Sequence, residues 1–346
     1  MSSSMNRQIL LKSRPVGEPK ESDFALVETP IPEPEEGEVL NRTVYLSLDP
    51  YMRGRMSDRA SYAAPVELGS VMVGGGVSQV MQSNHPQFSA GDFVLGYDGW
   101  QAYGVSKGET LRKLDPKQAS ISYALGITGM PGMTAYFALL DVGQPQSGET
   151  VVISAASGAV GSVAGQIAKI KGCRVVGVAG SDAKCDYVMK ELGFDECINR
   201  NTQDLSSALK AACPDGIDVY FDNTAGAILE AVLQQLNLGA RIPLVGLISQ
   251  YNAENPPPGP NLMPLLVKRA LIKGFLVSDY QQRQAEFLND VVQWLQVGKL
   301  KYKEDVVEDL ENAPRAFIGL LQGKNFGKLI VKVSDDSTRQ AYPMNQ

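Results

Sequence analysis

The stretch that decides the fold is Thr150-Val-Val-Ile-Ser-Ala-Ala-Ser-Gly-Ala-Val-Gly-Ser-Val-Ala-Gly-Gln-Ile-Ala-Lys169. Its β-branched beginning predicts a buried strand that runs into a turn of small residues, where Gly158 and Gly161 open a helix. A second apolar strand, 174–179, follows that helix at the spacing that a βαβ unit requires. We interpret the stretch as a dinucleotide-binding turn, with an ordinary strand-to-helix turn as the simpler alternative.

The two glycines have different tasks in such a turn. Gly158 lets the backbone approach a pyrophosphate, and Gly161 allows the helix to lie close to the strand. The start of the helix then offers free N–H groups and a partial positive charge to the phosphates. The pattern departs from Gly-x-Gly-x-x-Gly because Ala156 stands at the first glycine position.

The segment after the second strand bears on the choice between NAD and NADP. Asp182 lies at about the sequence distance of an acid that binds the ribose diol of NAD, but Ser181 and Asp182 also fit a helix cap. Gly180 leaves the strand end without an acid, whereas Ser181, Lys184 and Arg200 are able to surround the extra phosphate of NADP. This set of residues favours NADP over NAD.

The rhythm of the chain predicts two architectures. Residues 1–120 are β-rich, with glycines that suit the corners of a small barrel. From about Gly126, strands alternate with helices, which predicts a parallel sheet covered by helices on both faces. The expected strands are 150–154, 174–179, 194–198, 217–222, 241–247 and 272–277. The expected helices are 160–171, 182–192, 203–212, 225–237, 281–298 and 311–321. A last strand, 328–333, is expected to return to the first domain.

Composition limits the class of protein. At roughly 150 residues per domain, 346 residues suggest two domains. With 44% hydrophobic and 20% charged residues, the chain is not disordered. A net charge of −6 argues against nucleic-acid binding but allows a local basic pocket for one small phosphorylated ligand. No signal peptide or membrane span is recognisable, so we expect a cytoplasmic protein that does not associate with membranes.

The residues that bind zinc or act as nucleophiles are scarce. The only histidine is His85, and all four cysteines lie in the second half of the chain without a Cys-x-x-Cys pair: Cys173, Cys185, Cys197 and Cys213. A zinc site needs three or four such ligands, so we expect no metal. Ser-His-Asp and Cys-His catalysis are equally poor hypotheses.

Several motifs give the chain a specific resemblance. They are Arg42-Thr-Val-Tyr-Leu-Ser-Leu-Asp-Pro-Tyr-Met-Arg-Gly-Arg-Met56, Gly129-Met-Pro-Gly-Met-Thr-Ala135, the glycine turn, Phe221-Asp-Asn223, Ser249-Gln-Tyr-Asn252 and Gly323-Lys-Asn-Phe-Gly-Lys328. From about residue 7 to residue 333 the chain resembles the zinc-independent medium-chain dehydrogenase/reductases, in the group of prostaglandin reductases and bacterial NADPH-dependent curcumin reductases. The resemblance implies a GroES-like β-barrel domain built from 1–124 and 303–346, with a Rossmann domain, 125–302, inserted between them.

The activity implied by this resemblance is NADPH-dependent reduction of the carbon–carbon double bond of α,β-unsaturated ketones, including curcumin-like and other bulky enones. Hydride reaches the β-carbon, so negative charge develops on the carbonyl oxygen and needs a hydrogen-bond donor. Tyr251 matches the family's catalytic tyrosine, and the nicotinamide ribose hydroxyl donates to the same oxygen. A phenol with a pKa of about 10 stays protonated at neutral pH and is able to donate.

The resemblance also assigns further site residues. Tyr62 matches a tyrosine of the substrate pocket, and Tyr51 follows Asp49-Pro50, where the barrel domain is expected to face the cofactor. We expect both to join Tyr251 as catalytic residues, with a half-buried aromatic as the alternative for each. Tyr97 and Trp100 resemble the wall of the pocket. Cofactor contacts are implied for Gly158, Ala159, Val160, Gly161, Lys184, Asn223, Phe275, Leu276, Val277 and Asn325, and the segment after the second strand adds Ser181. Arg200 stands where relatives have a tyrosine near the adenosine, and an arginine there suits a phosphate or adenine contact.

Two other functions remain as hypotheses from the sequence. A quinone reductase of the same superfamily, or an NADPH-binding protein without turnover on the same fold, would share most of these motifs.

The sequence also bears on oligomeric state. The apolar strand 273–277 is expected to form the edge of the Rossmann sheet, and an apolar edge invites pairing. We therefore expect a homodimer joined at two such edges by two-fold symmetry.

Overall fold

The computed structural model describes residues 5–255 and 257–338, which form two compact units. One unit comprises the described parts of Met1–Leu125, Glu304–Asn325 and Leu329–Gln346. The other comprises Gly126–Lys303, apart from residue 256, together with Phe326–Lys328. We call them the sheet unit and the Rossmann unit.

The Rossmann unit is built on six parallel strands. They are β8 (Thr150–Ser154), β9 (Arg174–Ala179), β10 (Glu196–Asn199), β11 (Ile217–Phe221), β12 (Leu236–Leu244) and β13 (Leu271–Gly274). Their order across the sheet is β10-β9-β8-β11-β12-β13, and every neighbouring pair is parallel. This confirms the parallel sheet predicted from the alternating rhythm. The chain runs outward from β8 to β10 and then crosses back to β11, so the order reverses beside β8, where such sheets bind ligands.

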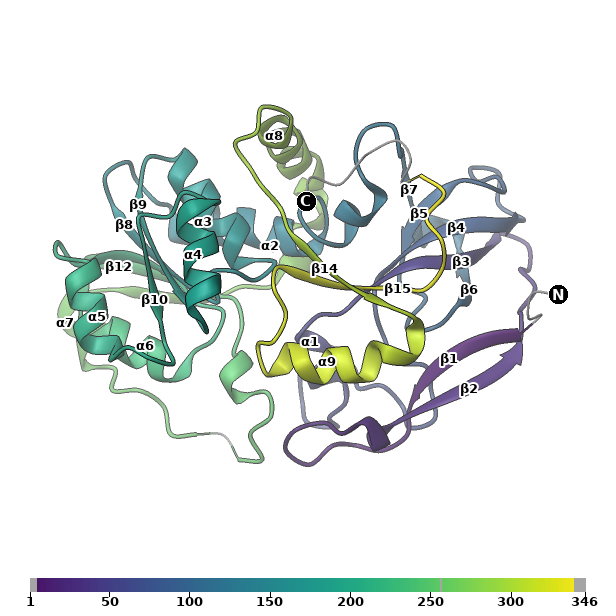
Figure 1. Ribbon diagram of the computed structural model, residues 1–346, viewed down its shortest axis with the longest axis horizontal. Coiled ribbons are helices and arrows are strands. Elements are labelled where there is room, and N and C mark those ends of the chain that lie inside the picture. Colours follow the sequence, from purple (N-terminus) through teal and green to yellow (C-terminus); the bar gives the residue numbers. More distant parts are fainter. Residues whose placement is uncertain (1–4, 256, 339–346) are drawn as a thin grey trace. The chain divides into compact units, whose positions relative to one another are not determined.

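Helices cover both faces of this sheet (Figure 1). The helices that follow its strands are α3 (Gly161–Ile170), α4 (Asp182–Lys190), α5 (Leu205–Ala212), α6 (Gly226–Leu233) and α7 (Met263–Lys268). Right-handed crossovers place α3 and α4 on one face and the three later helices on the other. The core on the second face joins Val152 and Val178 of the sheet to Leu209 of α5 and Val232 of α6. The unit also contains α2 (Met130–Phe137) and α8 (Gln284–Gln296).

Small residues bring α3 down onto the sheet. A Cβ on Gly161 would lie 2.4 Å from the carbonyl oxygen of Ala155, and one on Gly165 would lie 1.9 Å from Cζ of Phe194. Both distances are far below van der Waals contact, so neither position accepts a side chain without a shift of the helix. The start of α3 is therefore held directly beside the end of β8.

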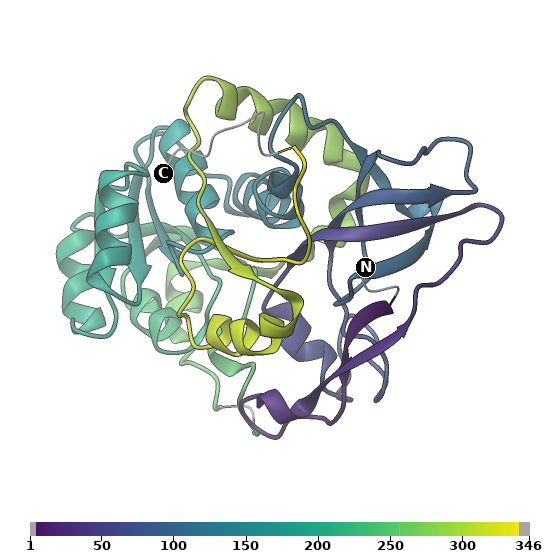
Figure 2. The same ribbon diagram turned by 45° about the vertical axis from the view of Figure 1, so that its right-hand side comes forward.

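The sheet unit is antiparallel. Its larger sheet contains β3 (Glu38–Ser47), β4 (Gly76–Ser83), β5 (Phe93–Gly96), β6 (Tyr103–Lys107), β7 (Arg112–Leu114), β14 (Glu304–Glu308) and β15 (Lys328–Lys332). β15 pairs with β3, so the chain returns to the first domain as predicted. β1 (Met5–Leu11) and β2 (Phe24–Pro30) form a separate hairpin, drawn in purple in Figure 2. The unit also contains two helices, α1 (Tyr51–Arg55) and α9 (Ala313–Leu321).

Several boundaries differ from those expected. α6 ends at Leu233 instead of 237, because β12 already begins at Leu236, and β13 ends at Gly274. In the β-rich first part of the chain, Val71 forms only an isolated bridge with Leu10. Within the described residues, no helix is both long and apolar enough to cross a membrane.

Substituting Gly165 should test how tightly α3 lies on the sheet. Gly165→Ala places a methyl group inside the ring of Phe194, and overpacking of this kind costs about 1–3 kcal/mol of unfolding free energy. We expect a lower thermal midpoint, measured by circular dichroism. Gly319→Ala in α9 is the control, because its nearest atom would lie 3.8 Å away and alanine favours a helix by about 1 kcal/mol over glycine. Equal midpoints for the two variants would contradict the packing.

Candidate cofactor and substrate site

Backbone hydrogen bonds hold the turn between β8 and α3: the N–H of Gly158 donates to the carbonyl oxygen of Ala155, and the N–H of Ser162 donates to that of Gly158. Val160 caps α3 without a side-chain hydrogen bond, so the first N–H groups of the helix have no side-chain acceptor there. A Cβ on Gly158 would meet only the carbonyl oxygen of Ala155, at 3.2 Å, and otherwise open space. Ala155 itself has a positive φ of 49°, a conformation that non-glycine residues rarely adopt. The turn from Gly158 through Ala159 and Val160 to Gly161 therefore fits a pyrophosphate.

The C-terminal motif lies against this same turn. The N–H of Gly327 donates to the carbonyl oxygen of Ser157 at 3.1 Å, and Gly158 bridges Gly327. Phe326 packs edge-on against Tyr187 of α4, and Nζ of Lys303 lies 4.5 Å from the centre of the Phe326 ring. These contacts hold the residues that follow Asn325 beside the glycine turn.

The residues expected around the extra phosphate meet at the end of β9. A Cβ on Gly180 would lie 3.8 Å from Nε and Nη2 of Arg200, so the guanidinium group lies directly against this glycine. Ser181 caps α4, where its hydroxyl oxygen accepts the N–H of Lys184 at 3.3 Å. Ser181, Lys184 and Arg200 thus come from two segments that the fold places together.

Asp182 behaves as the helix-cap interpretation predicts. It occupies the first turn of α4, where a negative charge suits the partial positive charge of the helix start. Its Oδ1 accepts the side-chain amide of Asn199 at 2.7 Å. The carboxylate therefore already has a hydrogen-bond partner in Asn199, and this arrangement favours NADP over NAD.

Tyr251 follows β12 at the carboxyl edge of the sheet. It ends a short 3₁₀ helix, Ile248–Gln250, and its hydroxyl oxygen accepts the backbone N–H of Leu247 at 3.3 Å. Burial raises the pKa of Tyr251, and the Leu247 N–H partly opposes that rise. The phenol therefore remains protonated at neutral pH, and its own proton is directed away from Leu247.

A buried polar network, which the sequence did not reveal, supports Asn223. Asp222 is fully buried, and its Oδ1 accepts the Tyr220 hydroxyl at 2.9 Å and the Ala225 N–H at 2.8 Å. The pKa of Asp222 is raised by burial, against the pull of these donors. Asn223 donates its side-chain amide to the carbonyl oxygen of Ser154 at 2.7 Å. The network fixes Asn223 between the ends of β8 and β11; the motif Phe221-Asp-Asn223 was its only sequence signal.

The segment expected near the nicotinamide leaves the sheet after β13. The N–H of Phe275 donates to the carbonyl oxygen of Leu244 at 3.0 Å. Its ring is buried and lies 5.0 Å from the ring of Tyr280. Leu276 is exposed, and Val277 begins a 3₁₀ helix that ends at Arg283. The Phe275 ring is therefore part of the core, whereas Leu276 is open to solvent.

Three of the expected substrate residues gather in the sheet unit. Burial, and then the Asp49 carboxylate, raise the pKa of Tyr51. Tyr97 and Tyr62 add to the same effect on Tyr51, so these phenols share one neighbourhood. Tyr62 and Tyr97 are 65% and 68% exposed, which leaves aromatic surface available to a ligand. Asp49, which holds the hydroxyl of Ser47, was not singled out from the sequence.

The expected place of Trp100 in the wall of the substrate pocket is wrong. Its side chain is fully buried, stacked 5.6 Å from Phe24 and packed edge-on against Phe317. It belongs to the core of the sheet unit and does not form the wall of a pocket. A large aromatic after Gly99 suits either role, and only the tertiary packing distinguishes them.

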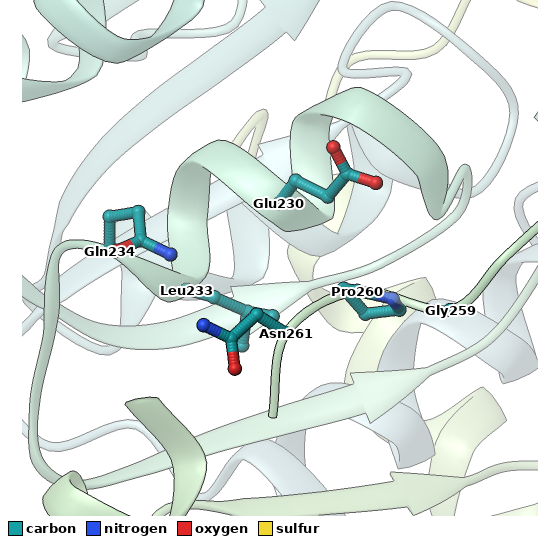
Figure 3. A pocket seen from close by; sticks show the side chains of 6 residues that line it. All are labelled: Glu230, Leu233, Gln234, Gly259, Pro260 and Asn261. Atoms are coloured by element: carbon teal, nitrogen blue, oxygen red, sulfur yellow. The ribbon is translucent and has the colours of Figure 1, made fainter. Parts of the chain in front are cut away.

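One surface hollow of about 310 Å³ lies apart from these groups (Figure 3). It is lined by Glu230, Leu233, Gln234, Gly259, Pro260 and Asn261. None of the expected site residues lines it. Across the described part of the chain, no group of three or more His, Cys, Asp or Glu side chains is arranged to hold a metal ion.

Comparison with known proteins matches both parts of the chain. A family model described as the N-terminal domain of oxidoreductase covers residues 7–114, and one described as zinc-binding dehydrogenase covers residues 159–296. The chain is 52% identical to the NADPH-dependent curcumin reductase of Escherichia coli (strain K12), over 96% of this chain and 98% of the relative. It is 44% identical to prostaglandin reductase 1 of Rattus norvegicus, over 93% and 97% of the two chains.

A solved structure agrees with these matches. The crystal structure of CurA in complex with NADPH from Vibrio vulnificus superposes with a TM-score of 0.92 at 54% identity, covering 95% of this chain and all of the other. Sequence and fold agree along nearly the whole chain. The chain belongs to the zinc-independent medium-chain dehydrogenase/reductases, in the group of the curcumin and prostaglandin reductases.

Proposed function

We propose that this protein is an NADPH-dependent reductase of the carbon–carbon double bond of α,β-unsaturated ketones. The observation that carries the proposal is the placement of Tyr251, a protonated phenol held by a backbone N–H at the carboxyl edge of a dinucleotide-binding sheet. The reductases named above, similar over nearly the full length, support the same reaction.

The Rossmann unit supplies the groups that hold the cofactor. The turn from Gly158 to Gly161 binds the pyrophosphate, Ser181, Lys184 and Arg200 bind the extra phosphate, and Asn223, Asn325 and residues 275–277 contact the remainder. NADPH, when bound, supplies the hydride that the double bond accepts. The protein's contribution is orientation and hydrogen bonding.

Tyr251 stabilises the charge that develops on the substrate carbonyl oxygen. Because the Leu247 N–H occupies one lone pair of the hydroxyl, the phenol donates its proton outward, and the same N–H stabilises the electron density left on the phenol oxygen. A preformed donor of this kind stabilises the substrate most strongly when its carbonyl oxygen becomes an enolate oxygen. The nicotinamide ribose hydroxyl is the second donor expected from the family.

The tyrosines of the sheet unit favour a bulky, aromatic enone. Tyr62 and Tyr97 expose flat apolar rings with a polar tip, which suits stacking on an aromatic substrate. Tyr51, protonated and beside Asp49, belongs to the same group of tyrosines.

We also propose a homodimer. β13 is the edge strand of the Rossmann sheet, and Leu271 and Ile272 on it are exposed. The neighbouring helix α7 exposes Leu266 and Val267. An unpaired apolar edge favours pairing with a second copy of itself.

Cofactor preference tests the phosphate contacts. Lys184→Ala removes a charged donor, and loss of such a hydrogen bond costs about 1.5–3 kcal/mol. We expect KM for NADPH to rise about tenfold or more, whereas the kinetics with NADH should not change. Lys190→Ala is the control, because that lysine lies at the other end of α4, paired with Asp186. Equal use of NADPH and NADH by the wild type would contradict the proposal.

Tyr251→Phe tests whether the Tyr251 hydroxyl donates a hydrogen bond to the enolate oxygen. Loss of one oxyanion donor typically lowers kcat about a hundred- to a thousandfold, and we expect the lower end because a second donor remains. The Kd for NADPH should change less than kcat, since the hydrogen bond is strongest in the transition state. Oxidation of NADPH with a panel of enones and quinones provides the readout, and Tyr103→Phe in β6 is the control.

The panel also separates the rival functions. Reduction of quinones but not enones would identify a quinone reductase, and no turnover with either would identify a binding protein. Full enone turnover by Tyr251→Phe would show that another group holds the enolate.

A charge on the sheet edge tests the dimer. Ile272→Lys places an ammonium group on β13, and burying an unpaired charge at an interface is strongly unfavourable. We expect light scattering to give the mass of two chains for the wild type and of one chain for the variant. Val297→Lys, an exposed valine after α8, should remain dimeric. A monomeric wild type at micromolar concentration would exclude the proposed assembly.

A further inference from the structure

Two of the four cysteines, although twelve residues apart in sequence, are neighbours in the fold. Cys185 lies in α4 and Cys197 in β10, and their sulfur atoms are 3.0 Å apart. The other two thiols have no part in this arrangement. Cys173 donates to the carbonyl oxygen of Gln146, and Cys213 is buried in the core against α5 and α6. All four are free thiols in the structure.

The fold keeps this pair close. Cys197 lies in register with Gly177 of β9, and a Cβ on Gly177 would lie 3.2 Å from the Cys197 sulfur. The glycine thus leaves the space that the sulfur occupies. Cys185 is held by its backbone N–H, which donates to the carbonyl oxygen of Ser181. Since a disulfide has a sulfur–sulfur distance of about 2.05 Å, the two atoms need to approach by only about 1 Å.

The pair joins the two segments that carry the phosphate contacts. Cys185 directly follows Lys184 in the first turns of α4, the helix capped by Ser181. Cys197 precedes Arg200, which lies against Gly180. Drawing the two sulfurs together therefore changes the spacing between the groups proposed to hold the phosphate.

We propose that Cys185 and Cys197 form a reversible disulfide when the protein meets hydrogen peroxide, and that the disulfide weakens NADPH binding. The second half of the proposal rests on the proposed function, through the phosphate contacts of Ser181, Lys184 and Arg200. Because binding and oxidation are linked, bound NADPH should in turn slow disulfide formation.

The chemistry needs one thiolate and one thiol. The Cys197 thiol donates a hydrogen bond to the Cys185 sulfur, and this lowers the pKa of Cys185 against the opposing effects of burial, Asp182 and Asp186. The Cys185 thiolate attacks hydrogen peroxide; a sulfur–oxygen bond forms, the oxygen–oxygen bond breaks, and the leaving hydroxide takes up a proton to become water. The Cys197 sulfur then attacks the Cys185 sulfenic acid, and the second oxygen leaves as water with the Cys197 proton. Two thiols lose two electrons, and one peroxide becomes two waters.

Peptide mapping tests whether the disulfide between Cys185 and Cys197 forms. Trypsin cleaves after Lys184, Lys190 and Arg200, so the two cysteines fall in the separate peptides 185–190 and 191–200. After treatment with hydrogen peroxide, we expect these two peptides to be linked with the loss of two hydrogens, and dithiothreitol to release them. Cys173 and Cys213 should remain available to alkylation in the unfolded protein. Unlinked peptides, with free thiols or separate sulfinic acids, would overturn the proposal.

Titration of the whole protein with NADPH tests whether the disulfide weakens NADPH binding. The fluorescence of the bound nucleotide gives the Kd. We expect the oxidised wild type to bind NADPH at least about fivefold more weakly and dithiothreitol to restore the affinity. In Cys185→Ser and Cys197→Ser the same peroxide treatment should leave the affinity unchanged, whereas Cys173→Ser should respond as the wild type does. An unchanged Kd in the linked wild type would overturn the coupling, and this result does not depend on any variant folding.

Lys184→Ala under reducing conditions separates the two proposals. Weaker NADPH binding by Lys184→Ala together with an unchanged Kd of the linked wild type would refute the coupling and leave the phosphate site standing. Unchanged binding by Lys184→Ala would refute that phosphate contact, and a weaker Kd in the linked wild type would still support the redox effect.

Discussion

The close approach of α3 to the parallel sheet is the constraint on which the Rossmann unit depends. Gly161 and Gly165 lie where a Cβ would collide with the Ala155 carbonyl group or the Phe194 ring. Because the helix lies this close, it begins beside the end of β8, at the turn that we propose binds the pyrophosphate. Gly327 of the C-terminal motif then pairs with this turn, which ties the last part of the chain to the same place.

The carboxyl edge of the sheet concentrates polar groups that are far apart in sequence. Since parallel strands end at the same edge, Ser181 after β9, Asn223 after β11 and Tyr251 after β12 all lie along it. Each is held by backbone or buried partners: Ser181 by the Lys184 N–H, Asn223 by Ser154 above the buried Asp222, and Tyr251 by the Leu247 N–H. Such support fixes a donor before any ligand arrives, which is what electrostatic catalysis requires.

The parallel sheet also explains why two cysteines acquire a neighbour. β10 is an edge strand beside β9, and α4 lies between them in the chain, so a residue early in α4 meets one on β10, whose sulfur lies against Gly177. In the sequence the four cysteines look alike and scattered, and only this register distinguishes Cys185 and Cys197 from the two thiols with other surroundings.

The sequence by itself determined the parallel sheet, the return of the last strand and the glycine turn, because these follow from local periodicity and from residues without side chains. It also indicated Lys184 and Arg200, since an acid is missing at Gly180. The tertiary structure decided what depends on packing between distant segments. Trp100 fills a core between Phe24 and Phe317, Asp182 is engaged by Asn199, and Asp222 is buried under Asn223. A tryptophan, an aspartate or a cysteine has the same chemistry in the core and at a functional site. Its role depends on neighbours that are distant in sequence, and the local sequence does not reveal them.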